Sequence, residues 1–427
     1  RKMFKSNIKD YNLDLFVPNL TTELIGFVSI FLVLLFTIFL ASRWPAISKI
    51  IFTAFIVRVL VMLIGHYFFH LPDSTNDAIG FEAGAWEWAE KGFINVLKNF
   101  PGPNSFFYSW MIAIPYSLFG RSILMMQSIG LLFGLGTVFL GWYIAKKLWD
   151  DHTANKVGWV LVFFPSLVLY SVITLREVYA SFFLLVAMLG IINWVRSSNY
   201  KSIVLTMVGF IGASLFHGVL LIGGIIFFII LILISLKRFF RSILNNRINH
   251  KSFIIILVSL IFLATYFSNK VYIPYLGHFK TTITFDRIKS TINVRMKGNA
   301  SYAEWTKINS PVEIIYKVPA RTVYFLFSPF PWELKKPTHL IGAIDGFLYM
   351  TLIYLIFCNR KVVWQDPALR IIFIILFCYI MVWGVGISNF GAGSRHRSKF
   401  VVEFILLAAP LIPRDYIPGK KSPKDHG

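Results

Sequence analysis

Long apolar stretches recur from one end of the chain to the other, and they restrict its fold more than any other feature. The hydrocarbon core of a bilayer is about 30 Å thick, and a helix of about 20 apolar residues crosses it. The chain therefore predicts a polytopic membrane protein with about eleven spans. These spans are expected at residues 20–42, 47–70, 122–145, 157–175, 178–195, 202–216, 218–236, 252–272, 339–357, 368–388 and 400–413.

The predicted fold class is all-α, a single transmembrane helical bundle over residues 1–427. Of these residues 56% are hydrophobic and 15% charged, and no apolar stretch alternates as a strand does. A helix satisfies its own backbone groups, which is what lipid requires. The apolar run over 202–236 is too long for one crossing, and His217-Gly218 interrupts it. Two short helices are therefore expected there.

Basic residues predict the orientation of the helices, because Lys and Arg close to membrane spans concentrate on the cytoplasmic side. The net charge of +22 follows largely from this topology, and it favours contact with anionic lipid headgroups. No nucleic-acid motif accompanies the charge, so nucleic acid is not an expected partner. The connections assigned to the cytoplasm hold Arg43, Lys49, Lys146, Lys147, Lys156, Arg196, Lys201, Lys237, Arg238, Arg241, Arg247, Lys251, Arg360, Lys361 and Arg370.

The opposite connections are expected to face outward. They are a first loop at residues 71–121, the turn at 176–177, a large loop at 273–338 and a basic loop at 389–399. This topology requires residues 104–120, which are apolar, aromatic and interrupted by a proline, to lie along the membrane as an interfacial helix.

Acidic residues mark the first outward loop. Asp73 and Asp77 are four residues apart and can share a helix face, and Glu82 follows five residues later. A carboxylate beside the membrane can take a proton from a hydroxyl or hold a divalent cation. The alternative is a surface helix whose acids only face water. Asp77 is the preferred functional acid because it opens an apolar and aromatic helix, and Glu82 is the second choice.

Basic residues on the outward side predict an anion site. Gly391-Ala392-Gly393-Ser394-Arg395-His396-Arg397 places two arginines around a histidine, after glycines that allow backbone N–H groups to approach a ligand. Arg176 interrupts a long apolar stretch and is either a phosphate ligand or the partner of Glu177 in a hairpin. Arg321 precedes an aromatic and proline-rich stretch at 325–333 and can reach an anion at headgroup depth. The alternatives are anchoring to lipid phosphate and an interfacial aromatic belt.

Taken together, these motifs resemble the GT-C superfamily of polyprenyl-phosphate-dependent membrane glycosyltransferases. The likeness rests on the acidic first loop, on Phe163-Phe164-Pro165-Ser166 followed by Leu175-Arg176-Glu177, on Ser328-Pro329-Phe330-Pro331-Trp332, and on the late Arg395-His396-Arg397. Within that superfamily the chain looks most like polymerases of the Wzy type, which act in the assembly of O-antigen, capsule or exopolysaccharide. The first loop lacks the adjacent acidic pair of the commoner pattern, so no cofactor is expected and a divalent cation is the alternative.

The resemblance implies a reaction and a location. The donor would be a glycan linked through pyrophosphate to undecaprenol, and the acceptor the terminal sugar of a lipid-linked repeat unit. Asp77, or else Glu82, would take the acceptor proton. The site would face the periplasm from a bacterial inner membrane, and a chain-length regulator is a candidate partner. The groups expected to neutralise the departing pyrophosphate are Arg176, Arg321, Arg395, His396 and Arg397.

Three alternatives to a polymerase stay open. A single-sugar transferase would use an undecaprenyl-phosphate-linked monosaccharide and add one residue, and a ligase would move a finished glycan to another acceptor. A transporter of lipid-linked oligosaccharide would not be an enzyme. Transporters usually contain repeated halves with paired broken helices, and the sequence shows no such repeat.

Overall fold

The chain folds into helices throughout the part that its computed structural model describes. This part comprises residues 19–412 apart from 103, 105, 246–249, 335–336 and most of 251–299. Within it, the only pairing of extended backbone is an isolated bridge between Ser301 and Asn389. The predicted all-α class is thereby confirmed. The predicted span at 252–272 and much of the loop at 273–338 lie outside the described residues.

Seven helices in the described part are long and apolar enough to cross a membrane, so the chain is a multi-pass membrane protein. A bent pair of helices, α7 (Asp151–Phe163) and α8 (Pro165–Val172), adds an eighth candidate if the two form one broken span. The seven are α1 (Leu20–Arg43), α2 (Ser48–Tyr67), α6 (Ile123–Leu148), α9 (Glu177–Ser197), α11 (Leu221–Leu244), α15 (Pro337–Cys358) and α17 (Pro367–Gly386).

The sequence predicts about eleven spans, and the difference has specific sources. Helix α10 (Tyr200–Phe216) is apolar but has only 17 residues, and α19 (Val401–Ala408) has eight. A helix rises about 1.5 Å per residue, so neither alone has the length of an ordinary span. The rest of the difference falls on residues 252–272, which lie mostly outside the description.

Two breaks interrupt the apolar helices. Pro165 lacks a backbone N–H and excludes Phe164 from helical geometry, and α7 and α8 meet there at 58°. The sequence predicts one straight span at this place, over 157–175. The second break is at His217, which is extended between α10 and the short helix at Gly218–Leu220. This break lies where the sequence predicts it.

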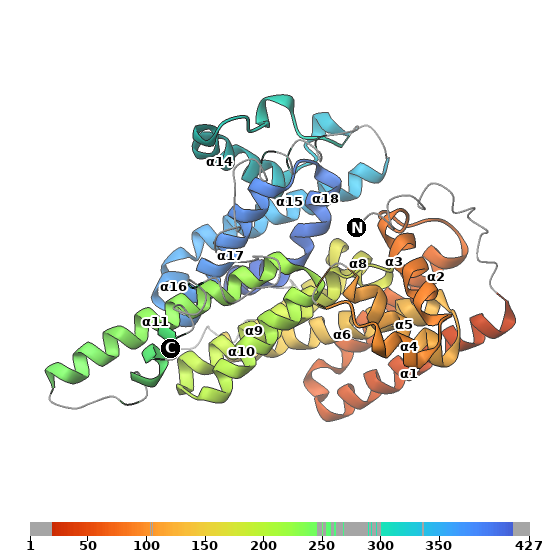
Figure 1. Cartoon of the computed structure of the whole chain (residues 1–427), viewed down its shortest axis with the longest axis horizontal. Coiled ribbons are helices and arrows are strands. Elements are labelled where there is room, and N and C mark those ends of the chain that lie inside the picture. Colours follow the sequence, from red (N-terminus) through yellow and green to blue (C-terminus); the bar gives the residue numbers. More distant parts are fainter. Residues whose placement is uncertain are drawn as a thin grey trace, which may run out of the picture.

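The helices of residues 71–121, the segment predicted as the first outward loop, form a compact group at one edge of the bundle (Figure 1). They are α3 (Asp77–Ala89), α4 (Phe93–Lys98) and α5 (Phe107–Phe119). Glu82 of α3 accepts two hydrogen bonds from Arg121, at 2.9 and 2.7 Å, and one from Tyr116 at 3.2 Å. These contacts connect α3 to α5 and to the start of α6.

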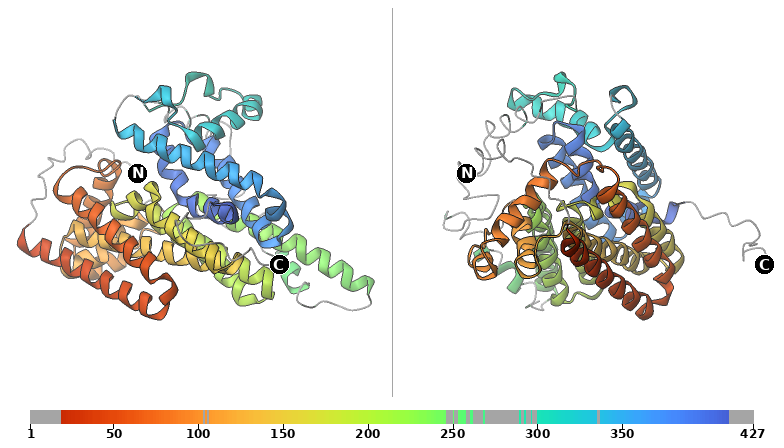
Figure 2. Two further views of the ribbon diagram at one scale, coloured as in Figure 1. Left: turned by 180° about the vertical axis from the view of Figure 1, so that it is seen from behind. Right: turned by 90° about the vertical axis from the view of Figure 1, so that its right-hand side faces the viewer.

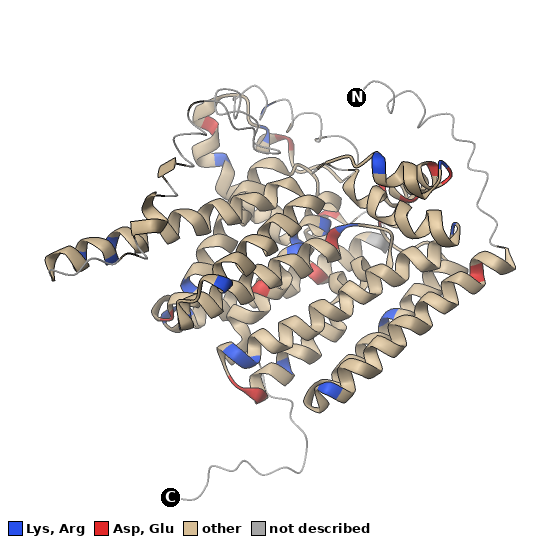
Figure 3. Ribbon diagram, turned by 60° about the horizontal axis from the view of Figure 1, so that its bottom comes forward, with Lys and Arg blue, Asp and Glu red and all other residues tan. Residues whose placement is uncertain are grey.

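The carboxy-terminal helices lie opposite this group, with α8 and α9 between the two (Figures 1 and 2). Helix α14 (Pro311–Phe327) packs on α17, and α18 (Phe390–Arg397) packs on α14 and α15. A short 3-10 helix at Ser398–Phe400 connects α18 to α19. The charged residues gather mainly at helix ends and in one internal cluster (Figure 3).

One end of the bundle is basic. Lys147 at the end of α6 donates to Asn193 at 3.2 Å, and Arg196 at the end of α9 donates to the Lys147 carbonyl. Lys146 pairs with Asp151 at 2.6 Å. Residues 71–121 and α18 lie at the other end, so the two ends of the bundle differ in chemistry.

A buried arginine stabilises the first break from inside the bundle. Arg58 of α2 is 1% exposed and donates to the carbonyls of Leu161 at 3.0 Å and Val162 at 3.3 Å. These carbonyls belong to the last turn of α7, where no following helical N–H can reach them. Lipid offers no water to replace such a donor, so the bent pair depends on Arg58.

We expect Arg58→Leu to destabilise the fold strongly, because each buried carbonyl left without a donor costs about 1–3 kcal/mol. Thermal unfolding of the purified protein in detergent measures the effect. Arg43→Leu is the matched control, since Arg43 is exposed at the end of α1. Equal melting temperatures for the two variants would contradict the role assigned to Arg58.

Candidate functional site

A cavity of about 380 Å³, lined by apolar side chains and a set of polar ones, opens between residues 70–75, α8, the start of α15 and α18. Its size falls within the range of ordinary small-molecule sites. It combines acids, hydroxyls and imidazoles in a chain that is mostly apolar, so the polar groups have gathered at one place. Those lining it are Asp73, Asp345, Thr75, Ser166, Tyr170, Ser394, His70 and His339.

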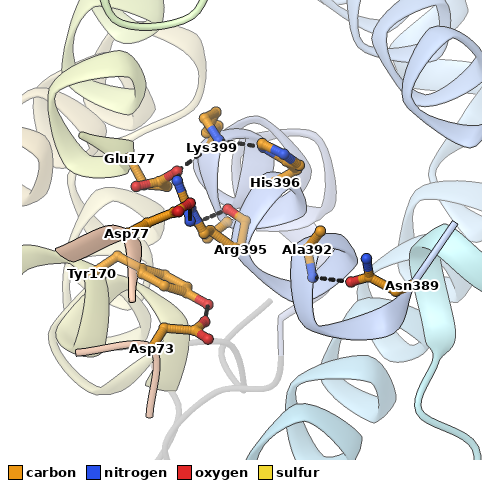
Figure 4. Close-up of polar contacts among 10 residues, drawn as sticks. Asp73, Asp77, Tyr170, Glu177, Asn389, Ala392, Arg395, His396 and Lys399 are labelled. Carbon is orange, nitrogen blue, oxygen red and sulfur yellow. Dashed lines mark hydrogen bonds and ion pairs between the residues drawn. The ribbon is translucent and has the colours of Figure 1, made fainter. Parts of the chain in front are cut away.

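Asp73 is the carboxyl of the first loop that lines this cavity. The Tyr170 hydroxyl of α8 donates to its Oδ2 at 2.7 Å (Figure 4). The Asp73 backbone is left-handed, with φ of 59°, which Asp tolerates better than most residues. Burial raises the pKa of Asp73, while Tyr170 and the charge of Arg395 act in the opposite direction. A carboxyl with a raised pKa in a cavity is suited to accepting a proton.

Arg395 connects the first loop to the helices behind it. Its Nε donates to Glu177 Oε1 at 2.7 Å, and its other side donates to Asp77 Oδ2 at 2.6 Å (Figure 4). The two carboxylates differ in environment, since the Glu177 side chain is 1% exposed and that of Asp77 is 65% exposed. The bond to Glu177 is therefore internal, whereas water or a ligand can displace Asp77.

Lys399 is the second cation on Glu177. Its Nζ lies 3.3 Å from Glu177 Oε1 and 2.8 Å from Nδ1 of His396. Burial lowers the pKa of Lys399 to about 7, assisted by the charges of Arg395 and Arg176 and opposed by Glu177. This ammonium group is therefore the cation of the cluster whose charge responds most readily to a bound anion.

His396 is a packing residue of the cluster. Its ring stacks on Trp383 with centroids 4.2 Å apart and meets His217 edge to face at 5.1 Å. Burial lowers the pKa of His396 well below its usual value, so the imidazole is neutral at pH 7. It contributes no positive charge, and its Nδ1 accepts the hydrogen of Lys399.

Arg176 belongs to the same cluster. It is the residue immediately before α9, and its guanidinium lies 5.2 Å from the centre of the Phe81 ring in α3. Its charge is one of those that lower the pKa of Lys399. The sequence leaves open whether Glu177 pairs with Arg176, and in the structure Glu177 forms ion pairs with Arg395 and Lys399.

Arg397 lies in the interior, away from this cluster. It donates to Asp345 at 3.0 Å, to the carbonyls of Leu326 and Ser328 at 2.9 and 2.8 Å, and to Gly342 at 2.9 Å. Leu326 and Ser328 are at the end of α14. Arg397 therefore satisfies the free carbonyls of that helix end.

Arg321 performs the same task for α17. Its guanidinium donates to the carbonyls of Gly384 at 3.2 Å and Ile387 at 2.6 Å, at the end of that helix, and to Thr306 at 3.0 Å. The structure thus brings Asp77, Arg176, Arg395 and His396 together. Arg321 and Arg397 instead donate to the carbonyls at the ends of α17 and α14. Glu82 is held by Arg121 and does not line the cavity.

Several groups of the site carry no predicted role in the sequence. The spacing predicts that Asp73 shares a helix face with Asp77, whereas Asp73 lies before α3 and lines the cavity. Tyr170 and Asp345 lie inside predicted spans and carry no local signal of function. Lys399 is four residues after Arg395, a spacing that places two side chains on one helix face.

No family model, curated protein or solved structure matches this chain. Among the described residues, no group of three or more His, Cys, Asp or Glu side chains is placed to hold a metal ion. A function must therefore be inferred from the cavity and the charged cluster beside it.

Replacement of Glu177 tests whether its ion pairs with Arg395 and Lys399 hold α9 against α18 and the helix that follows it. Glu177→Gln leaves the buried Lys399 without a carboxylate and leaves Arg395 with only the exposed Asp77. Loss of one partner of a buried pair costs about 3–5 kcal/mol. We expect a clear fall in melting temperature in detergent. Glu304→Gln makes the same change in an exposed pair with Lys307 and should cost less than about 1 kcal/mol. A Glu177→Gln variant as stable as this control would contradict the assignment.

Proposed function

We propose that the chain is a membrane glycosyltransferase of the GT-C type, which polymerises undecaprenyl-pyrophosphate-linked repeat units into a surface polysaccharide. One observation carries the proposal: the Asp73 carboxyl lines a cavity, and Arg395 lies close enough to influence its pKa. Transfer of a sugar from a phosphate leaving group requires such a pair, a base for the acceptor and a cation for the leaving oxygen.

Asp73 is the proposed base. The acceptor hydroxyl gives its proton to Asp73 as its oxygen attacks the anomeric carbon of the donor sugar. Tyr170 holds one carboxylate oxygen, which leaves the other for the acceptor. Asp77, the base favoured by the sequence, is bonded to Arg395 here and is the second candidate.

Arg395 is the proposed ligand of the leaving group. When the bond between the anomeric carbon and the pyrophosphate oxygen breaks, its electrons remain on the pyrophosphate, whose added charge requires donors. The Asp77 carboxylate, exposed and 2.6 Å from Arg395, occupies the position that an anionic oxygen of the donor would take. Lys399 and Arg176 add positive charge behind it.

The two faces of the bundle suggest its place in a cell. Basic residues such as Lys147 and Arg196 lie at one end, and the cavity lies at the other. By the positive-inside rule the basic end faces the cytoplasm. The proposed site then faces the periplasm from a bacterial inner membrane, where lipid-linked donor and acceptor glycans are its substrates and a chain-length regulator a candidate partner.

The rival functions differ in their products. A single-sugar transferase would extend an acceptor by one residue, and a ligase would attach a finished glycan to another molecule. A transporter would move lipid-linked glycan without changing its length. Incubation of the purified protein with lipid-linked repeat units separates these outcomes, because only a polymerase gives a ladder of lengths.

Asp73→Asn tests the proposed base. Loss of a general base typically lowers the rate by about 10² to 10⁴-fold, so the ladder should disappear within the assay time. Asp77→Asn is the matched control on the same loop and should retain activity, because Arg395 keeps its bond to Glu177. If the Asp73→Asn variant formed the ladder at the normal rate and the Asp77→Asn variant formed none, the base would be Asp77 and not Asp73.

Arg395→Ala tests the proposed leaving-group ligand. Loss of one stabilising donor costs on the order of 3 kcal/mol at the transition state, or roughly 10² to 10³-fold in rate. Arg395→Lys should recover part of the activity because it keeps the charge. Polymer of full length from normally expressed Arg395→Ala protein would refute the proposed role.

A further inference from the structure

A second cavity, of about 370 Å³, lies at the basic end of the bundle, between α9, α11 and α17. Its lining is apolar apart from two arginines, Arg238 of α11 and Arg370 of α17. The cavity belongs to the opposite end from the proposed active site, so the proposed reaction leaves it unexplained.

The lining residues follow one face of each helix. On α11 they are Ile230, Leu233, Ile234 and Arg238, and on α17 they are Pro367, Arg370, Ile371 and Ile374. Intervals of three and four residues place side chains on a single helix face. Each helix thus presents an apolar stripe that carries one arginine.

Both arginines lie at the same end of the groove. The helices run in opposite directions, because Tyr379 near the end of α17 donates at 2.5 Å to the Leu220 carbonyl just before α11. Arg238 is therefore late in α11 where Arg370 is early in α17. From either arginine the apolar stripe leads inward, over about 12 Å on α11.

The mouth of the groove lies at the end of α9. Trp194 and Val195 complete the lining, and the next residue, Arg196, donates to the Lys147 carbonyl of the basic end. Among the described residues neither Arg238 nor Arg370 forms an ion pair. Asp366 is the nearest acid along α17, and it is engaged in capping Ala368 and Leu369 of that helix.

We propose that this groove binds an anionic phospholipid. Its phosphate lies between Arg238 and Arg370, and an acyl chain follows the apolar stripes inward. Guanidinium groups suit phosphate oxygens because they present paired donors, and an apolar stripe suits an acyl chain. The positive-inside rule places this end in the leaflet where anionic lipids attract basic residues.

Native mass spectrometry of the full chain tests the site. The protein is released from detergent micelles that contain equal amounts of phosphatidylglycerol and phosphatidylcholine. We expect the wild type to retain phosphatidylglycerol selectively. Each of Arg238→Ala and Arg370→Ala should lower its retention about fivefold, and the double variant should lower it further.

Two comparisons separate the site from general charge and from misfolding. Arg241→Ala is the matched control, because it removes an equal charge from α11 at a position outside the groove lining and should retain the lipid. Arg238→Lys and Arg370→Lys keep the charge and should recover binding in part. Equal loss in Arg241→Ala would show that overall charge, not the groove, binds the lipid.

Three results would overturn the proposal. The first is equal retention of the two lipids by the wild type. The second is unchanged retention of phosphatidylglycerol by a folded double variant, which would leave the groove to another occupant, such as the apolar segment at 252–272. The third is displacement of the lipid by millimolar inorganic phosphate, which would identify a free-anion site that does not need the apolar stripe.

Discussion

The structure depends on buried arginines that satisfy the carbonyls of helix ends. Arg58 serves the end of α7, Arg321 the end of α17 and Arg397 the end of α14. The last four carbonyls of any helix have no helical partner, and inside a membrane protein no bulk water replaces it. A guanidinium carries five donors in one plane, so a single arginine can satisfy two or three such carbonyls at once. Helices can therefore end inside the bundle, where their last carbonyls would otherwise have no hydrogen-bond donor.

These helix ends are what make room for the cavity. Helix α8 can turn away from α7 because Arg58 holds the end that α7 leaves, and α8 brings Tyr170 and Ser166 to the cavity wall. Helix α14 ends before Pro329, another lining residue, where Arg397 holds its carbonyls and also orients Asp345. Glu177 then connects the two sides through Arg395 and Lys399. The charged cluster and the cavity thus lie between helix ends, not along continuous helices.

The sequence predicts the helical membrane class well because apolar length is a strong signal, and it predicts the break at His217 because Gly218 follows in a run too long for one span. It does not predict the bend at Phe164, since the apolar composition continues on both sides of it. It also cannot separate an arginine that binds an anion from one that caps a helix, because both require the same guanidinium in an apolar setting. Burial and the identity of the acceptor decide, and these are properties of the folded chain.

The basic residues near the C-terminus are close together in the sequence, but the helix that contains them points their side chains in different directions. The sequence predicts a loop at residues 389–399 whose two arginines bind the same anion. The Asn389 side chain instead accepts from Ala392 at 2.7 Å and starts a helix, despite the two glycines. Residues two apart on a helix point in nearly opposite directions, whereas residues four apart share a face. Arg395 and Lys399 therefore face Glu177, while Arg397 faces Asp345. The proposed anion site therefore consists of Arg395 with Lys399, and Arg397 belongs to the helix ends that support it.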